Sequence, residues 1–220
     1  MTVIEMNHSV LLKLKTLDRV DIKDPNSYDI VTLMNNAQDI IVDELVINKK
    51  YEYLRPITES ISTLAASFDS SYTSGINGAD IIDLSGLAVT ANTEYRNYIR
   101  SQSKITKTYA PTISSGVYLN NQEISKEELN IFEYNGTNRP IFTNPKALLE
   151  GDYLIVVPDY YTTISEIISV VVRTPKILDL TTNTGAYTTT CELPVELHQI
   201  IVDKTVQLFA ETINVNDIKK

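Results

Sequence analysis

The sequence predicts an α+β fold in which N- and C-terminal amphipathic helices pack with a central, mostly antiparallel β-sheet or β-sandwich. Two observations predict it: apolar residues recur at helical spacing near both ends, and the middle is rich in tyrosine, threonine, isoleucine and valine in extended patterns. Helices and strands are grouped instead of alternating, which argues against repeated βαβ units. We expect one domain over residues 1–220, helical at about 1–70 and 193–214 and β-rich at about 85–190.

Two helices are expected first. A short amphipathic helix covers residues 8–17, with Asn7 as its cap, and an Asp24–Ser27 turn follows it. The second helix, at residues 30–45, is better defined. Apolar residues recur along it at steps of three and four, and polar residues occupy its opposite face.

A third helix is expected after a polar hinge at Asn48–Lys50. Pro56 suits the first turn of a helix, because its missing N–H would have no partner there anyway. Apolar residues then recur at steps of four, three and four up to Phe68. Residues 70–78 have the composition of a loop.

Extended segments dominate the middle of the chain. Strands are expected at residues 87–90, 95–107, 116–119, 153–157 and 164–173. The last of these is rich in β-branched residues, so we expect it at the centre of its sheet, and Pro158 and Pro175 end the final two strands. Ser125–Glu128 has the spacing of a capping box and predicts one short helix within this region.

The most organised segment is the last one. A strand-like polar run, Tyr187–Thr190, precedes Cys191, and Pro194 then stands where a long amphipathic helix begins. Apolar residues continue at helical spacing to about Ile213, and we expect this helix to pack on the 30–45 helix. Nothing in it is chemically reactive, which indicates packing or assembly.

Composition narrows the class of protein. The 220 residues include 28 acidic and 19 basic ones, a net charge of −9, which argues against a surface that neutralises nucleic-acid phosphates. No stretch approaches the ~18 apolar residues of a membrane span. Lys13 and Lys15 interrupt the apolar stretch that a secretory signal would need. The single cysteine, Cys191, excludes an intramolecular disulfide and a cysteine-based zinc site, and we expect it to be buried.

No active site is expected, and therefore no enzyme, cofactor or metal. The sequence has no glycine-rich phosphate loop and no nucleophile elbow, although the members of a Ser-His-Asp triad are brought together by the fold and not by spacing. His8 lies near a terminus, and His198 is expected to be a partly exposed structural residue. Paired carboxylates are expected on solvated helix faces: Asp39, Asp43, Glu44, Glu127 and Glu128.

The 13 tyrosines, without any tryptophan, are the one compositional oddity. They are concentrated in or beside the expected strands and hinges. Tyrosine has a high β-propensity, which fits half-buried strand positions, but it is also enriched at the centres of protein interfaces. Two interpretations therefore stand side by side, ordinary strand residues or an assembly surface.

Three segments in chain order carry a resemblance to a known family. They are Leu33–Ile41 with its Asn-Ala-Gln core, Arg55–Pro56 with the segment ending at Leu64–Ser67, and Cys191–Asp203 running into Phe209–Ile213. With the strands between them, from about residue 28 to 213, the chain resembles the neck ring (head-to-tail connector) proteins of crAss-like bacteriophages. The last segment is the most specific, and residues 121–150 look like a variable insertion.

The resemblance implies a virion structural protein of the neck and tail region, assembled in the cytoplasm of a host bacterium. Copies would form a closed ring of about twelve subunits. The ring would lie between the portal protein and the tail, in contact with the portal and with neighbouring neck or tail rings. Genome DNA would pass through without specific binding, for which an acidic chain is suited because like charges repel.

Contacts between neighbouring copies are expected at the hinge residues Tyr51, Tyr53 and Leu54 and at the loops around 70–80 and 121–150. An alternative from another class is a β-sandwich module of a phage particle that binds a receptor or a glycan. It would use the same tyrosines and the threonine-rich loops. The amphipathic helices at both ends favour the connector.

Overall fold

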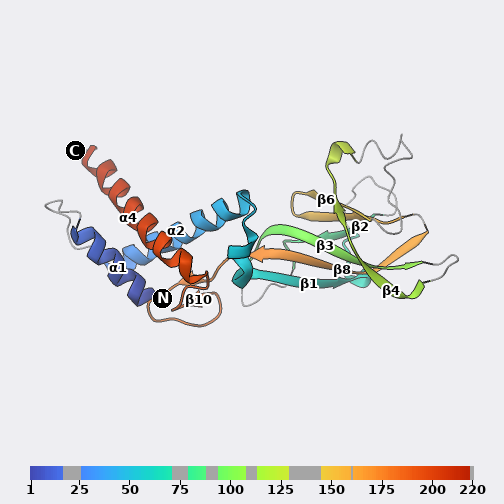
Figure 1. Cartoon of the computed structure of the whole chain (residues 1–220), viewed down its shortest axis with the longest axis horizontal. Helices are drawn as coiled ribbons and strands as arrows, with labels where there is room; N and C mark the ends of the chain where they lie inside the picture. Colours follow the sequence, from blue (N-terminus) through green and yellow to red (C-terminus); the bar gives the residue numbers. More distant parts are fainter. Residues whose placement is uncertain are drawn as a thin grey trace. The chain divides into compact units, whose positions relative to one another are not determined.

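The structure, a computed structural model, describes residues 1–16, 26–70, 79–87, 94–107, 113–128, 145–159 and 161–218. The chain is α+β, with helices at both ends and mostly antiparallel sheets between them, as predicted (Figure 1). It divides into two compact units. The helical unit joins Met1–Thr58 to Thr174–Lys220, and the β unit consists of Glu59–Val89 and Glu94–Arg173.

The described residues of the helical unit form α-helices, a 3₁₀ helix and a small parallel sheet. These elements are α1 (Val3–Thr16), α2 (Ser27–Ile47), η1 (Tyr51–Ile57), β9 (Ile177–Leu178), β10 (Tyr187–Thr188) and α4 (Val195–Ile218). Figure 1 shows α4 lying across α1 and α2, and it contacts both. The expected packing of the last helix on the second is therefore confirmed. So is its start directly after Pro194, although it continues to Ile218.

The first helix begins earlier than predicted, because a capping box precedes the expected cap. The Thr2 backbone N–H donates to Glu5 Oε2 at 2.8 Å, and the Glu5 N–H donates to Thr2 Oγ1 at 3.2 Å. The prediction of Asn7 as the cap is wrong, since Asn7 lies inside α1 and is buried. The second helix is capped by Asn26, whose side chain accepts from the Tyr28 N–H.

The predicted third helix is wrong. Pro56 lies inside η1, and the chain then forms strand β1 (Thr58–Leu64) and a short 3₁₀ helix, η2 (Ala65–Ser67). The reason is tertiary. Strand β1 pairs beside β8 (Thr162–Arg173), where Glu59 accepts a hydrogen bond of 2.8 Å from Arg173 Nε. Serine and threonine also favour strands and turns over helix interiors, so the apolar spacing was misleading. The helical part thus ends at Ile57, not near residue 70.

The β unit holds two four-stranded sheets, ordered β1-β8-β3-β4 and β2-β7-β6-β5. The remaining strands are β2 (Asp80–Asp83), β3 (Tyr95–Lys107), β4 (Ile113–Asn120), β5 (Gln122–Glu123), β6 (Lys146–Glu150) and β7 (Tyr153–Val157). The strands expected at 95–107 and 153–157 are confirmed, and β8 lies inside its sheet, as its β-branched residues predict. The segment expected at 87–90 falls mostly outside the described residues, and Leu87 is not in a strand.

Both sheets contribute to one core, so the β unit is a sandwich. Ile105, Ile164 and Ile167 from the first sheet are buried in the same cluster as Leu154 and Val156 from the second. At the end of β5 the capping box forms as predicted. The Ser125 N–H donates to Glu128 Oε2 at 2.8 Å, and the Glu128 N–H donates to Ser125 Oγ at 3.2 Å.

The loops around 70–80 and 121–150 were expected to contact a neighbouring copy. Large parts of both, residues 71–78 and 129–144, lie outside the described residues. Within the described part of the chain, no helix combines the length and the apolar character needed to cross a bilayer.

Helix α2 ends in a Schellman motif that leads to a first testable prediction. The Lys50 N–H donates to Leu45 O at 2.9 Å and the Lys49 N–H to Val46 O at 3.0 Å. Lys49 has a φ of 55°, a left-handed conformation that glycine adopts without strain.

We expect Lys49→Gly to stabilise the protein by about 1 kcal/mol, because the substitution removes this backbone strain. The change is measured by urea denaturation. The control Lys50→Gly should give no gain, because Lys50 has a φ of −88°. Equal effects of both substitutions would contradict the strain argument.

A second prediction concerns Asp80, at the start of β2. Burial raises the pKa of Asp80 from 3.8 to about 6. A carboxyl group whose pKa is higher in the folded state stabilises the fold while protonated, and this contribution is lost as the pH rises through the folded-state value. We expect the stability of Asp80→Asn relative to wild type, measured as the difference between their urea midpoints, to be greater at pH 7 than at pH 4. A difference that does not change with pH would refute this assignment.

Candidate functional site

A group of polar side chains, which we call the latch, lies at the junction of α2, β9 and the segment before α4. Its members are Asn35, Gln38, Cys191 and Glu192. Asn35 Nδ2 donates to Leu178 O at 3.1 Å, and the Leu178 N–H donates to Asn35 Oδ1 at 2.8 Å. The side-chain amide of Asn35 thus pairs with both backbone groups of Leu178, as a neighbouring strand would.

The second helical residue of the latch extends this pairing. Gln38 stands one turn after Asn35, and Gln38 Nε2 donates to Lys176 O at 3.2 Å. On its other edge the same segment contacts β10, since the Ile177 N–H donates to Ala186 O at 2.8 Å. The backbone of Lys176–Leu178 is therefore held on two sides.

The segment before α4 completes the latch. The Lys176 N–H donates to Glu192 Oε2 at 2.9 Å, and Cys191 Sγ lies 3.6 Å from Gln38 Oε1, within reach of a weak S–H hydrogen bond. Two segments quoted for the family resemblance, Leu33–Ile41 and Cys191–Asp203, therefore meet here.

All four latch residues stand in segments that carry the family resemblance, but the sequence alone assigns them no common role. Asn35 was expected on the polar face of the 30–45 helix, opposite the apolar stripe, whereas the structure has it half-buried against Leu178. Gln38 gave the one signal, because its polar side chain falls beside the apolar stripe. Gln38 is only 2% exposed, and a buried amide needs a partner. The identity of that partner could not be read from helical periodicity.

The two residues with the most reactive side chains are buried in packing positions. Burial raises the pKa of Cys191 to about 11, so its thiol is protonated near neutral pH, and the expected burial is confirmed. His198 is 2% exposed, which corrects the expectation of a partly exposed residue. Its Nε2 lies 2.8 Å from Leu193 O and its Nδ1 lies 2.8 Å from the Met1 amino group.

Burial, opposed in part by the hydrogen bond to Leu193, lowers the pKa of His198. In the neutral tautomer that fits these contacts, Nε2–H donates to Leu193 O and Nδ1 accepts from Met1. His198 therefore joins the start of α4 to the first residue of the chain. His8 is exposed on α1. Within the described ranges, no three histidine, cysteine or acidic side chains are grouped so as to hold a metal ion.

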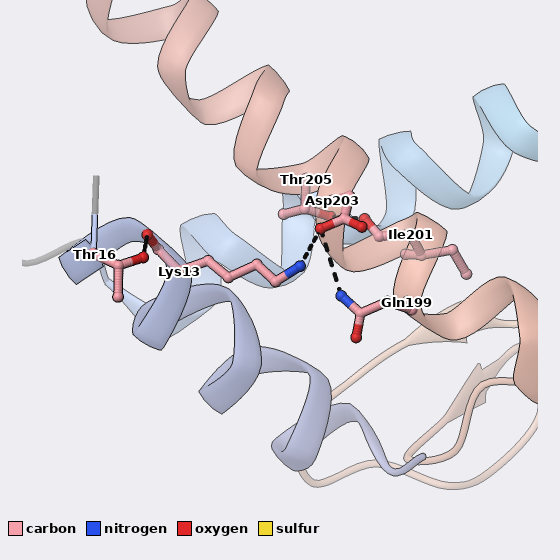
Figure 2. A network of polar contacts seen from close by, with 6 residues as sticks. All are labelled: Lys13, Thr16, Gln199, Ile201, Asp203 and Thr205. Carbon is pink, nitrogen blue, oxygen red and sulfur yellow. Dashed lines mark hydrogen bonds and ion pairs between the residues drawn. The ribbon is translucent and has the colours of Figure 1, made fainter.

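Helices α1 and α4 are joined by an ion pair at the surface (Figure 2). Lys13 Nζ pairs with Asp203 Oδ1, to which Gln199 Nε2 also donates at 3.4 Å. Figure 2 shows the extended Lys13 side chain reaching from α1 to the side of α4. Both side chains are exposed, so this pair contributes little to stability.

The three residues expected at the subunit contact differ in their exposure to solvent. Tyr53 is 37% exposed, and Tyr51 is half-buried. Leu54 is completely buried, and its carbonyl oxygen accepts from Thr58 Oγ1 at 2.9 Å. Leu54 therefore belongs to the core under η1 and cannot touch a neighbour in this conformation.

The described tyrosines include both buried and exposed residues. Tyr98 is a core residue whose hydroxyl lies 2.9 Å from Ser101 Oγ. Tyr118 and Tyr161 are 47% and 53% exposed. On the outer face of the first sheet, the Tyr118 hydroxyl donates to Glu166 Oε2 at 2.7 Å, and Lys104 Nζ lies 5.4 Å from the centre of its ring.

Comparison of the chain with protein-family models and with curated proteins found no match. The resemblance to neck ring proteins therefore rests on the three quoted segments, and the function that it implies is a proposal.

The latch generates a third prediction. Removing the Asn35 amide leaves the backbone N–H and C=O of Leu178 without their partners, at a cost of about 1–3 kcal/mol. We expect Asn35→Ala to lower the free energy of unfolding by that amount in urea denaturation. The adjacent Asn36 is exposed, so Asn36→Ala is the matched control and should change stability little. Equal losses from both variants would show that the latch contributes nothing specific.

Proposed function

We propose that the chain is a structural, non-catalytic subunit of a phage neck. Copies would form a closed ring between the portal protein and the tail and surround the channel for the genome. The proposal also places the protein in the virion, after assembly in the cytoplasm of the host bacterium. Its basis is the resemblance to neck ring proteins of crAss-like phages.

The observation that carries the proposal is the meeting of two of the resembling segments in the latch. Leu33–Ile41 and Cys191–Asp203 are far apart in the sequence, yet Gln38 and Cys191 are in contact, and Asn35, Gln38 and Glu192 hold the same backbone segment. Segments that share a family signature are expected to pack together if they define a common fold. This supports a shared fold with that family and, through it, a connector role.

Two further features fit a connector. Cys191 and His198, the residues best suited to chemistry, serve in packing. The net charge of −9 also suits a channel through which DNA must move, because a basic lining would retain the phosphates by releasing counterions.

One observation favours the alternative, a glycan- or receptor-binding module. Tyr118 stands on the outer face of the β1-β8-β3-β4 sheet, with Lys104 and Glu166 beside it, and Gln102 Nε2 donates to Asn120 Oδ1 at 2.8 Å on the neighbouring strands. An exposed aromatic ring among amide and charged side chains is a surface on which a sugar ring could stack.

A fourth prediction tests the ring. Purified wild-type protein should give closed oligomers by native mass spectrometry and negative-stain electron microscopy. Tyr53→Ala should weaken ring formation without unfolding the subunit, because the exposed tyrosine contributes contact area. Tyr187→Ala is the control, since Tyr187 has a similar exposed fraction, 43% against 37%.

Location in the particle separates the two candidates. An antibody against the chain should label the neck of the phage particle. Labelling of peripheral fibres, together with a soluble monomer, would overturn the connector and favour the binding module.

A further inference from the structure

The end of α2 and the following 3₁₀ helix expose a surface that we call the basic corner. It consists of Ile47, Lys49, Lys50, Tyr53 and Arg55. All five are exposed, and Ile47 has an exposed fraction of 77%, the highest among the large apolar side chains of the described residues. An aliphatic and an aromatic side chain thus lie within a few residues of three cations.

The charge of the corner is opposite to that of the protein. Residues 49–55 contain three basic residues and one acidic residue, whereas the whole chain has 19 basic and 28 acidic residues. Elsewhere in the described chain, Lys13, Lys104, Lys126 and Arg173 are in ion pairs. No ion pair within the described residues involves a cation of the corner.

Backbone conformation is a second, independent sign. Lys49 occupies the left-handed position of the Schellman motif, where glycine would be less strained. Residues held in strained backbone conformations are concentrated at functional sites. A lysine at this position extends the charged surface that Lys50 and Arg55 begin.

The corner combines residue types that are enriched at the centres of interfaces, Tyr53 and Arg55, with two lysines, which suit a polar rim. Tyrosine and arginine are enriched among the residues that dominate binding energies, and an aliphatic neighbour supplies apolar area. The cations call for a partner surface rich in carboxylates. A second copy of this chain offers one: α2 contains no basic residue, and its acidic residues Asp29, Asp43 and Glu44 are exposed.

We infer that the basic corner of one copy docks on an acidic surface of the next copy, in a head-to-tail contact that closes the ring. The inference rests on the proposed ring and adds which face of the subunit makes the contact and the charge of the opposing face. A heterologous contact of this type uses two different surfaces, so an open chain of copies has one unused surface at each end until the ring closes.

The test compares the full-length wild-type chain with three variant forms. Lys49→Glu/Lys50→Glu reverses the corner, and Lys15→Glu/Lys204→Glu makes the same charge change on α1 and α4. Self-association is measured by sedimentation and native mass spectrometry, in low and high salt. We expect at least about a tenfold loss of affinity for the corner variant, little loss for the control, and weaker wild-type assembly in high salt.

Mixing the corner variant with wild type gives a second test. The corner variant keeps its acidic surface, so it can bind the end of a chain of wild-type copies but cannot dock onward. An equal mixture with wild type should therefore end chain growth early and yield short open oligomers. The third form, Lys49→Gly, should be more stable than wild type yet assemble less well. It separates docking from folding even if the double variant folds poorly.

The outcomes distinguish the inference from the proposed function. Wild-type protein that forms no ring would remove the proposed function and this inference together. Rings that form equally well in wild type and corner variant would overturn the inference alone. If the corner variant forms rings but loses binding to a short DNA duplex, the corner contacts nucleic acid and the inference is also overturned.

Discussion

The segment Lys176–Leu178 follows β8. Within the described residues, its strand β9 pairs with β10 along one edge. Along the other edge, side-chain amides of α2 replace a neighbouring strand: Asn35 serves both backbone groups of Leu178, and Gln38 serves the carbonyl of Lys176. Each of these groups would cost about 1–3 kcal/mol if it were buried without a partner. The rest of the helical unit is arranged around this constraint, because the same contacts set where α2 must lie.

The start of α4 is located by the same segment. Glu192 accepts from the Lys176 N–H, and Cys191 contacts Gln38, so the residues before the helix are attached to α2 as well as to β9. The first residues of the chain join this arrangement through the segment directly after β10 and through α4. The Val3 N–H donates to Thr189 O at 2.9 Å, and the Met1 amino group contacts His198. His198 and Cys191 are thus in contact with buried polar groups, the carbonyl of Leu193 and the amide of Gln38.

Several elements were predictable from local pattern alone. Strand β3 has the predicted bounds, Tyr95–Lys107, because its tyrosines, threonine and isoleucines favour extended backbone over a long stretch. Strand β1 was missed, since its apolar spacing also fits a helix and its pairing with β8 is a tertiary contact. The cap Asn7 was misassigned because a capping box at Thr2 and Glu5 starts α1 one turn earlier. Leu54, expected at an interface, is a core residue whose burial depends on how η1 turns.

The α+β class, the interior position of β8 and the start of α4 after Pro194 follow from the sequence alone, because propensity, periodicity and capping act between residues that are close along the chain. The tertiary structure was needed to show what Asn35, Gln38 and Cys191 contact. Their partners lie 138 to 153 residues away, and hydrogen bonds over such separations leave no periodic trace. It also decided which residues of the 47–55 segment face solvent, since exposure follows from the packing of the whole helical unit.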